Sequence, residues 1–247
     1  MRTIDYTAHL EREGGLLADA AAKAGEQSPV PTCPGWTTGE LVRHTATVHR
    51  WAARIVGERL PGPVPEDPVP ERPTGPALLP WFLDGHGDLV RTLRAAGPDT
   101  DCWAFLPAAS PVAFWTRRQA HETAVHRVDA ESARGGDLSP IDPDFAADGI
   151  DELLTGFHAR SRSRVRAEQP RTLRVRPSDA DAAWTVRICA DAPPSTERSA
   201  DGPADCELTG PAQTLYLVLW NRLPLDAATL TGDTALATLW RETSAVI

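Results

Sequence analysis

The amino-acid sequence predicts an α+β fold in two parts, a helical domain over residues 1–165 and a small α+β domain over residues 166–247. Two observations lead to this prediction. In the first part, apolar residues recur at helical spacing between loops that are rich in proline and glycine. From about residue 168, apolar and polar residues instead alternate with a period of two, as they do in half-buried strands.

Four helices are expected in the helical part, and a further amphipathic segment follows them. The four are predicted over residues 5–25, 37–59, 76–96 and 112–134, and the amphipathic segment over 143–164. The second helix has a capping box, because Glu40 stands three residues after Thr37. The fourth should end at Gly135 and Gly136. The proline-rich stretch over 61–76 is predicted to be an extended connection.

In the second part the pattern predicts short strands and then two helices. The strands are expected over residues 172–176, 184–188 and 205–209, and the helices over 212–220 and 234–243.

Composition and charge exclude several classes of function. The chain has 247 residues, 41 % apolar and 24 % charged, which is ordinary for a globular protein. No apolar run is long enough for a membrane span, and the N-terminus lacks the apolar region of a secretory signal, so we expect a cytoplasmic protein. The net charge of −9, without a basic patch, argues against a nucleic-acid partner. The four cysteines contain no C-x-x-C pair, and we expect free, mostly buried thiols.

Three side chains are candidates for a metal site. His44 lies in an otherwise apolar helical row, and Glu122 and His126 are one turn apart on the fourth predicted helix, which suits two ligands of one ion. Two imidazoles and one carboxylate leave a fourth position open, as in catalytic zinc sites, although nickel, iron and cobalt also suit this set. The same spacing equally describes a core histidine and a surface ion pair.

Neighbouring polar residues have alternative interpretations. Asp129 could orient a ligand imidazole, or it could pair with Arg118 or Arg127. His49 and His121 lie about 140° and 100° around their helices from His44 and Glu122, and both are expected at the surface. The tryptophans at 36, 51, 103 and 115 could line a pocket or fill a core.

Two stretches of sequence resemble motifs of the mycothiol-dependent maleylpyruvate isomerase family. Residues 30–44 (VPTCPGWTTGELVRH) resemble its opening motif, and residues 115–131 (WTRRQAHETAVHRVDAE) resemble its second motif. The resemblance implies a DinB-like four-helix bundle followed by a small domain of sterol-carrier-like shape. It also implies that His44, Glu122 and His126 bind zinc or another divalent metal, and that mycothiol is the cofactor.

A family arginine in the C-terminal domain helps to hold the thiol or the substrate, and Arg222 is the best match. The local match is short, and Arg222 could instead cap the carbonyls at the end of a helix.

The resemblance implies thiol chemistry at the open position of the metal. A metal-bound thiolate would act as the nucleophile, either adding reversibly to a cis double bond so that the bond can rotate, or undergoing S-transfer to a small electrophile. The partners would then be a low-molecular-weight thiol and a small electrophilic molecule, with no nucleic acid or membrane, in a monomer or homodimer. A metal-dependent hydrolase and a non-catalytic binding module with a vestigial site are the alternatives.

Overall fold

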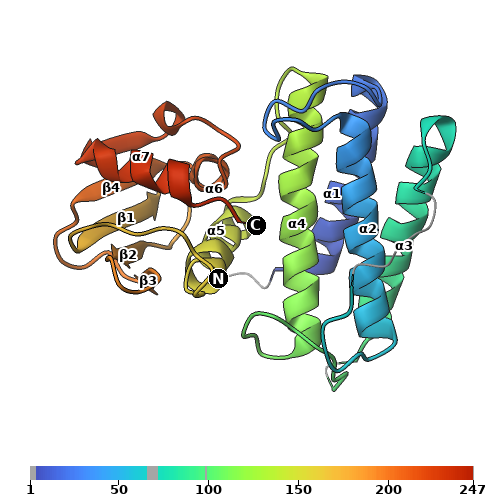
Figure 1. Cartoon of the computed structure of the whole chain (residues 1–247), viewed down its shortest axis with the longest axis horizontal. Helices are drawn as coiled ribbons and strands as arrows, with labels where there is room; N and C mark the ends of the chain where they lie inside the picture. Colours follow the sequence, from blue (N-terminus) through green and yellow to red (C-terminus); the bar gives the residue numbers. More distant parts are fainter. Residues whose placement is uncertain (1–3, 66–71, 98, 247) are drawn as a thin grey trace. The chain divides into compact units, whose positions relative to one another are not determined.

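The computed structural model describes residues 4–65, 72–97 and 99–246, and it contains two compact units (Figure 1). One unit runs from Asp5 to Ser139, and the other is formed by the chain from Pro140 onward together with Ile4. The first is helical and the second contains a sheet with helices, so the predicted α+β class is confirmed. Among the described helices, none combines the length and apolar character that a membrane span requires.

The helical unit is built from four long helices. They are α1 (Tyr6–Ala24), α2 (Thr38–Gly57), α3 (Leu78–Ala95) and α4 (Pro111–Arg134), with a short 3-10 turn at Gly75–Ala77 before α3. All four lie within about two residues of their predicted bounds. The predicted extended connection over 61–76 falls partly on residues 66–71, which lie outside the described residues.

Local sequence signals set the ends of these helices. Asp5 caps α1 by accepting a hydrogen bond from the backbone N–H of Ala8 at 3.0 Å. Ser110 caps α4 in the same way, and Pro111 occupies the first helical position, where its missing N–H has no cost. Gly135 ends α4 with a φ of 79°, a left-handed value that glycine adopts without strain.

Helix packing decides which faces of the bundle are buried. In Figure 1, α4 runs alongside α1 and α2, while α3 lies on the other side of α2. A cluster of buried apolar side chains fills one part of the interior, among them Leu17, Leu41, Val42, Phe82 and Ala130. Because α2 contacts both α3 and α4, it is buried on more than one face.

The second unit begins with a helix that the sequence assigned to the bundle. It contains α5 (Pro143–Asp151), which continues into a π-helical segment, Glu152–Phe157, and α5 packs against α6 (Ala212–Leu219). The two compact units therefore divide between Ser139 and Pro140, whereas the sequence placed the boundary between residues 165 and 166. The amphipathic pattern of 143–164 reports a buried face but not which core buries it.

A five-stranded sheet forms the rest of this unit, in the order β3-β2-β1-β4-β5. The strands are β1 (Arg171–Pro177), β2 (Trp184–Ile188), β3 (Ser195–Glu197), β4 (Cys206–Gly210) and β5 (Thr229–Gly232). The central pair, β1 and β4, is parallel, and the other pairs are antiparallel. Both α6 and α7 (Thr234–Thr243) contact β1 and β4, and a 3-10 turn at Leu225–Ala227 precedes β5. The sequence missed the two edge strands, β3 and β5.

The four cysteines are free, as expected, and Cys102 and Cys206 are buried while Cys33 and Cys189 are partly exposed.

Candidate metal centre

His44 is positioned by the N-terminal cap of α2. The hydroxyl of Thr37 accepts a hydrogen bond from the backbone N–H of Glu40 at 3.3 Å, and the carboxylate of Glu40 accepts one from the backbone N–H of Thr37 at 2.6 Å. This reciprocal capping box fixes where α2 begins. It thereby fixes the rotation at which His44, in the second turn, leaves the helix.

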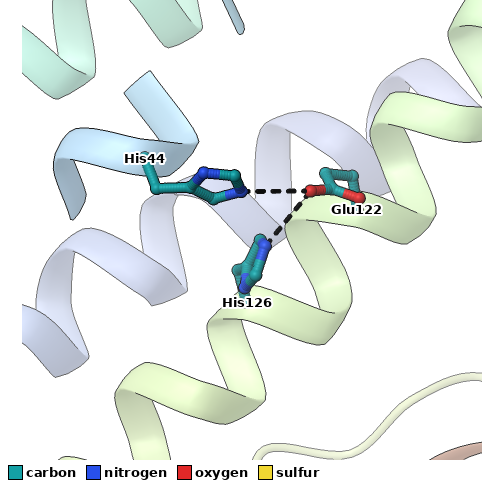
Figure 2. Close-up of side chains that lie close together, drawn as sticks. All are labelled: His44, Glu122 and His126. Atoms are coloured by element: carbon teal, nitrogen blue, oxygen red, sulfur yellow. Dashed lines mark hydrogen bonds and ion pairs between the residues drawn. The ribbon is translucent and has the colours of Figure 1, made fainter. Parts of the chain in front are cut away.

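Glu122 and His126 project from α4 toward His44, as Figure 2 shows. Oε1 of Glu122 lies 3.7 Å from Nε2 of His44 and 3.1 Å from Nε2 of His126. The three candidate ligand atoms all lie within 4.8 Å of one another. The structure therefore brings together the three residues that the sequence singled out, which helical spacing alone could not do.

The donor set fits a divalent cation. With bonds of about 2.1 Å, the ligands of a tetrahedral zinc lie about 3.4 Å apart, and the two separations from Glu122 stand on either side of that value. The exposed fraction of the side chain is 33 % for His44, 23 % for Glu122 and 10 % for His126. A cation held by these atoms would keep a face that small molecules can reach.

A second layer of polar groups holds the two ligands of α4. Arg118 donates from Nη2 to Oε2 of Glu122 at 3.1 Å, which leaves Oε1 directed toward the two imidazoles. Asp129 lies 2.9 Å from Nδ1 of His126 through its Oδ2, so that Nε2 faces the centre. Of the alternatives that the sequence left open for Asp129, the structure shows contact with His126. The guanidinium of Arg127 binds other carboxylates.

The electrostatics of the centre favour an ionised carboxylate. Burial alone would raise the pKa of Glu122, but the hydrogen bonds with His126 and His44 and the charge of Arg118 outweigh burial and hold that pKa well below its ordinary value. Burial would lower the pKa of His126, but the hydrogen bonds to Asp129 and Glu122 raise it to about 9. A cation at this centre therefore competes with a proton for His126 at neutral pH.

Trp36 lies against two of the three candidate ligands. Its ring centroid lies 5.1 Å from that of His44, edge to face, and 6.5 Å from that of His126, nearly parallel. The sequence left open whether the tryptophans fill a core or line a pocket. Trp36 lies against the candidate ligands, whereas Trp51 and Trp115 pack against each other with their ring centroids 5.1 Å apart.

The predicted surface positions of His49 and His121 are wrong, because both side chains are fully buried. His49 lies 2.9 Å from the hydroxyl of Thr123 on α4, and its ring centroid is 5.2 Å from that of His86 on α3. His49 lies where α2 meets both α3 and α4, so a rotation of about 140° from His44 does not lead to solvent. Burial and the nearby His86 lower the pKa of His49 well below its ordinary value, so that it is neutral.

Arg222 lies in the other compact unit, just after α6. Its Nη1 donates to the carbonyl of Trp220 at 2.8 Å, which is the helix-end contact expected of a capping arginine. Asn221, which precedes it, has a φ of 61° and ends the helix in the left-handed conformation. Any role of Arg222 toward thiol or substrate stays a proposal.

Comparison with known proteins decides the family. Residues 7–131 match the model of the mycothiol maleylpyruvate isomerase N-terminal domain, and residues 144–239 match that of the MDMPI C-terminal domain. The chain belongs to the mycothiol maleylpyruvate isomerase family.

Solved structures show the same fold. Crystal structures of the mycothiol-dependent maleylpyruvate isomerase, and of its variant with one histidine replaced by alanine, match with TM-scores of 0.61 and 0.63. Each match has 14 % sequence identity and covers 92 % of either chain, which supports the fold alone. No curated protein sequence matches the chain significantly.

Proposed function

We propose that this member of the family is a metal-dependent enzyme that uses mycothiol either to isomerise a small electrophilic molecule or to join the thiol to it through its sulfur (S-transfer). Zinc is the first candidate for the cation, with His44, Glu122 and His126 as its ligands. The observation that carries the proposal is the convergence of two imidazole nitrogens and one carboxylate oxygen from two helices. Membership of the family supports the choice of thiol.

Addition to an electrophilic carbon requires a nucleophile that is present in its reactive form at neutral pH. A thiol bound beside a divalent cation is supplied as the thiolate, which adds readily to electrophilic carbon. The chain's own groups prepare the position. Glu122 contributes a negative charge that would retain a cation, and the ring of Trp36 packs beside the imidazoles of His44 and His126. The exposed parts of His44 and Glu122 leave another side open to small molecules.

Arg222 is proposed to hold a carboxylate of the substrate or of the thiol. A guanidinium offers paired N–H donors that match the two oxygens of a carboxylate. This assignment follows from the family motif.

The first experiment measures metal content. The purified protein, loaded with zinc and freed of excess, should hold one equivalent, and the His44→Ala variant should hold far less, because removing one of three ligands leaves an incomplete centre. His9→Ala is the matched control, since His9 lies on α1 outside the three ligands and should leave the zinc content unchanged. Full zinc content in His44→Ala would refute the ligand assignment.

The second experiment measures thiol binding and turnover. The zinc-loaded protein should bind mycothiol more tightly than glutathione and should then convert maleylpyruvate or a comparable electrophile, and both properties should be lost in His44→Ala. Zinc binding without any effect of mycothiol would instead indicate a hydrolase or a non-catalytic module.

A further inference from the structure

The hydroxyl group of Thr32 links the loop between α1 and α2 to α4. Thr32 donates from Oγ1 to Oδ1 of Asp129 at 2.6 Å. The loop closes on itself around this residue, because the backbone N–H of Val30 donates to the carbonyl of Trp36 at 2.9 Å and that of Trp36 donates to the carbonyl of Cys33 at 3.0 Å. Thr32 thus lies near the tip of a folded loop, in contact with the helix that bears two of the candidate ligands.

Asp129 connects this loop to the metal centre. Its side chain is fully buried, and its two oxygens lie against different groups, Oδ1 against Thr32 and Oδ2 against Nδ1 of His126. An ionised carboxylate can only accept hydrogen bonds, so the proton of this contact belongs to Nδ1 of His126. By the same argument, the hydrogen bond between Nε2 and Oε1 of Glu122 needs a second proton, and a bound cation would replace that proton on Nε2.

We propose that Asp129 and Thr32 are positioning residues of the metal centre, in which Asp129 fixes the tautomer and orientation of His126 and Thr32 fixes Asp129. This inference rests on the proposed function, since it presumes a cation at His44, Glu122 and His126. Neither residue is one of the three candidate ligands. Partners of this kind commonly change metal affinity by about 10–100-fold.

The hydrogen bond between Thr32 and Asp129 also helps to position Trp36 beside the candidate ligands. Trp36, four residues beyond Thr32 in the same loop, stacks on His126 and contacts His44. Anchoring the loop to Asp129 therefore orders both a ligand and the ring that covers it. The buried carboxylate of Asp129 is held in place by the hydrogen bonds that it accepts. Without the hydroxyl of Thr32, its Oδ1 would lose a hydrogen bond that offsets the cost of burying a charged oxygen.

The test uses near-isosteric variants and two measurements that do not depend on turnover. Asp129→Asn keeps the shape of the side chain but removes its charge, and Thr32→Val removes only the hydroxyl. Thr32→Ser restores the hydroxyl, and Ser132→Ala is the matched control, because Ser132 lies 3.1 Å from Thr32 but donates to the backbone carbonyl of Asp129 rather than to its carboxylate. Zinc affinity is measured by competition with a chromogenic chelator, and ligand geometry by the absorption spectrum of the cobalt-substituted protein.

Asp129→Asn should bind zinc about 10–100-fold more weakly than the unchanged protein and should alter the cobalt spectrum. Thr32→Val should weaken binding by a smaller factor, and Thr32→Ser and Ser132→Ala should bind normally. Since Thr32 acts through Asp129, Thr32→Val should have no further effect in an Asp129→Asn background.

Zinc affinity within twofold of the unchanged protein in folded Asp129→Asn, with an unaltered cobalt spectrum, would refute the positioning role and leave the metal centre standing. If Asp129→Asn does not fold, equal affinities of Thr32→Val and Thr32→Ser would refute it. Failure of the unchanged protein to bind zinc would overturn the proposed function, and the positioning role with it.

Discussion

Arg127 is the cation of a buried network that joins α4 to α1, and replacing it should destabilise the helical unit strongly. Its Nε lies 2.7 Å from Oε2 of Glu13, and its Nη1 lies 2.6 Å from Oε2 of Glu131. All three side chains are at most 1 % exposed. In the variant Arg127→Met, two carboxylates lose their shared counter-charge in a site that water does not reach.

Breaking a buried ion pair by removing one partner costs about 3–5 kcal/mol. Although two ion pairs are broken, the loss of stability should not be twice this value, because both glutamates keep other contacts in the variant. Glu131 still accepts hydrogen bonds from the backbone N–H of Ser139 at 3.0 Å and from its hydroxyl at 2.6 Å, and Glu13 still contacts Arg12 at 2.7 Å. For a unit of this size, a loss of this magnitude lowers the midpoint of thermal unfolding by roughly 10–20 °C.

The stability lost in Arg127→Met should also depend on pH, in a direction that follows from the pKa of Glu131. Burial would raise the pKa of Glu131, but hydrogen bonds from Ser139 and the charge of Arg127 hold that pKa below its ordinary value. The stabilisation from Glu131 is therefore present above the pKa of the unfolded chain and is lost as the pH falls. In Arg127→Met, Glu131 of the folded protein takes up a proton more readily, so the difference in stability between the two proteins should shrink toward about pH 4–5.

Thermal unfolding followed by far-ultraviolet circular dichroism measures the effect. Arg91→Met is the matched control, because Arg91 is 69 % exposed and its ion pair with Asp88 should contribute no more than about 1 kcal/mol. Adding Glu13→Gln and Glu131→Gln to Arg127→Met should recover part of the loss, since no buried charge is left unpaired. A loss below about 1 kcal/mol in Arg127→Met, equal to that of the control, would refute the reasoning.

Two further predictions concern the second compact unit. Burial lowers the pKa of His158 from 6.5 to about 4, so its neutral form stabilises the fold above pH 6.5, and this contribution of about 3 kcal/mol is lost as the pH falls toward 4. In His158→Gln, which does not titrate, denaturant unfolding should depend less on pH in this window, and an unchanged slope would contradict the assignment. Arg222→Lys should raise KM for a carboxylate substrate with zinc content and kcat little changed, whereas an unaltered KM in steady-state kinetics would exclude Arg222 from substrate binding.

Features that depend on nearby residues could be predicted well. The capping box at Thr37 and Glu40 and the glycine at the end of α4 are each read within a few residues, and the four helices match their predicted bounds to within about two residues. The edge strands could not be predicted in this way. Both β3 and β5 are short and largely exposed, so they carry little apolar alternation, and their conformation is set by hydrogen bonds to β2 and β4.

By itself, the sequence determined the helices, the residue types of the candidate centre and the one-turn spacing of Glu122 and His126, because these follow from the periodicity of a single helix. Only the tertiary structure decided that His44 meets them, that Asp129 contacts His126, and that His49 is buried rather than exposed. Those outcomes depend on which faces of separate helices pack together. Packing is a property of the whole bundle, and no window along the chain contains it.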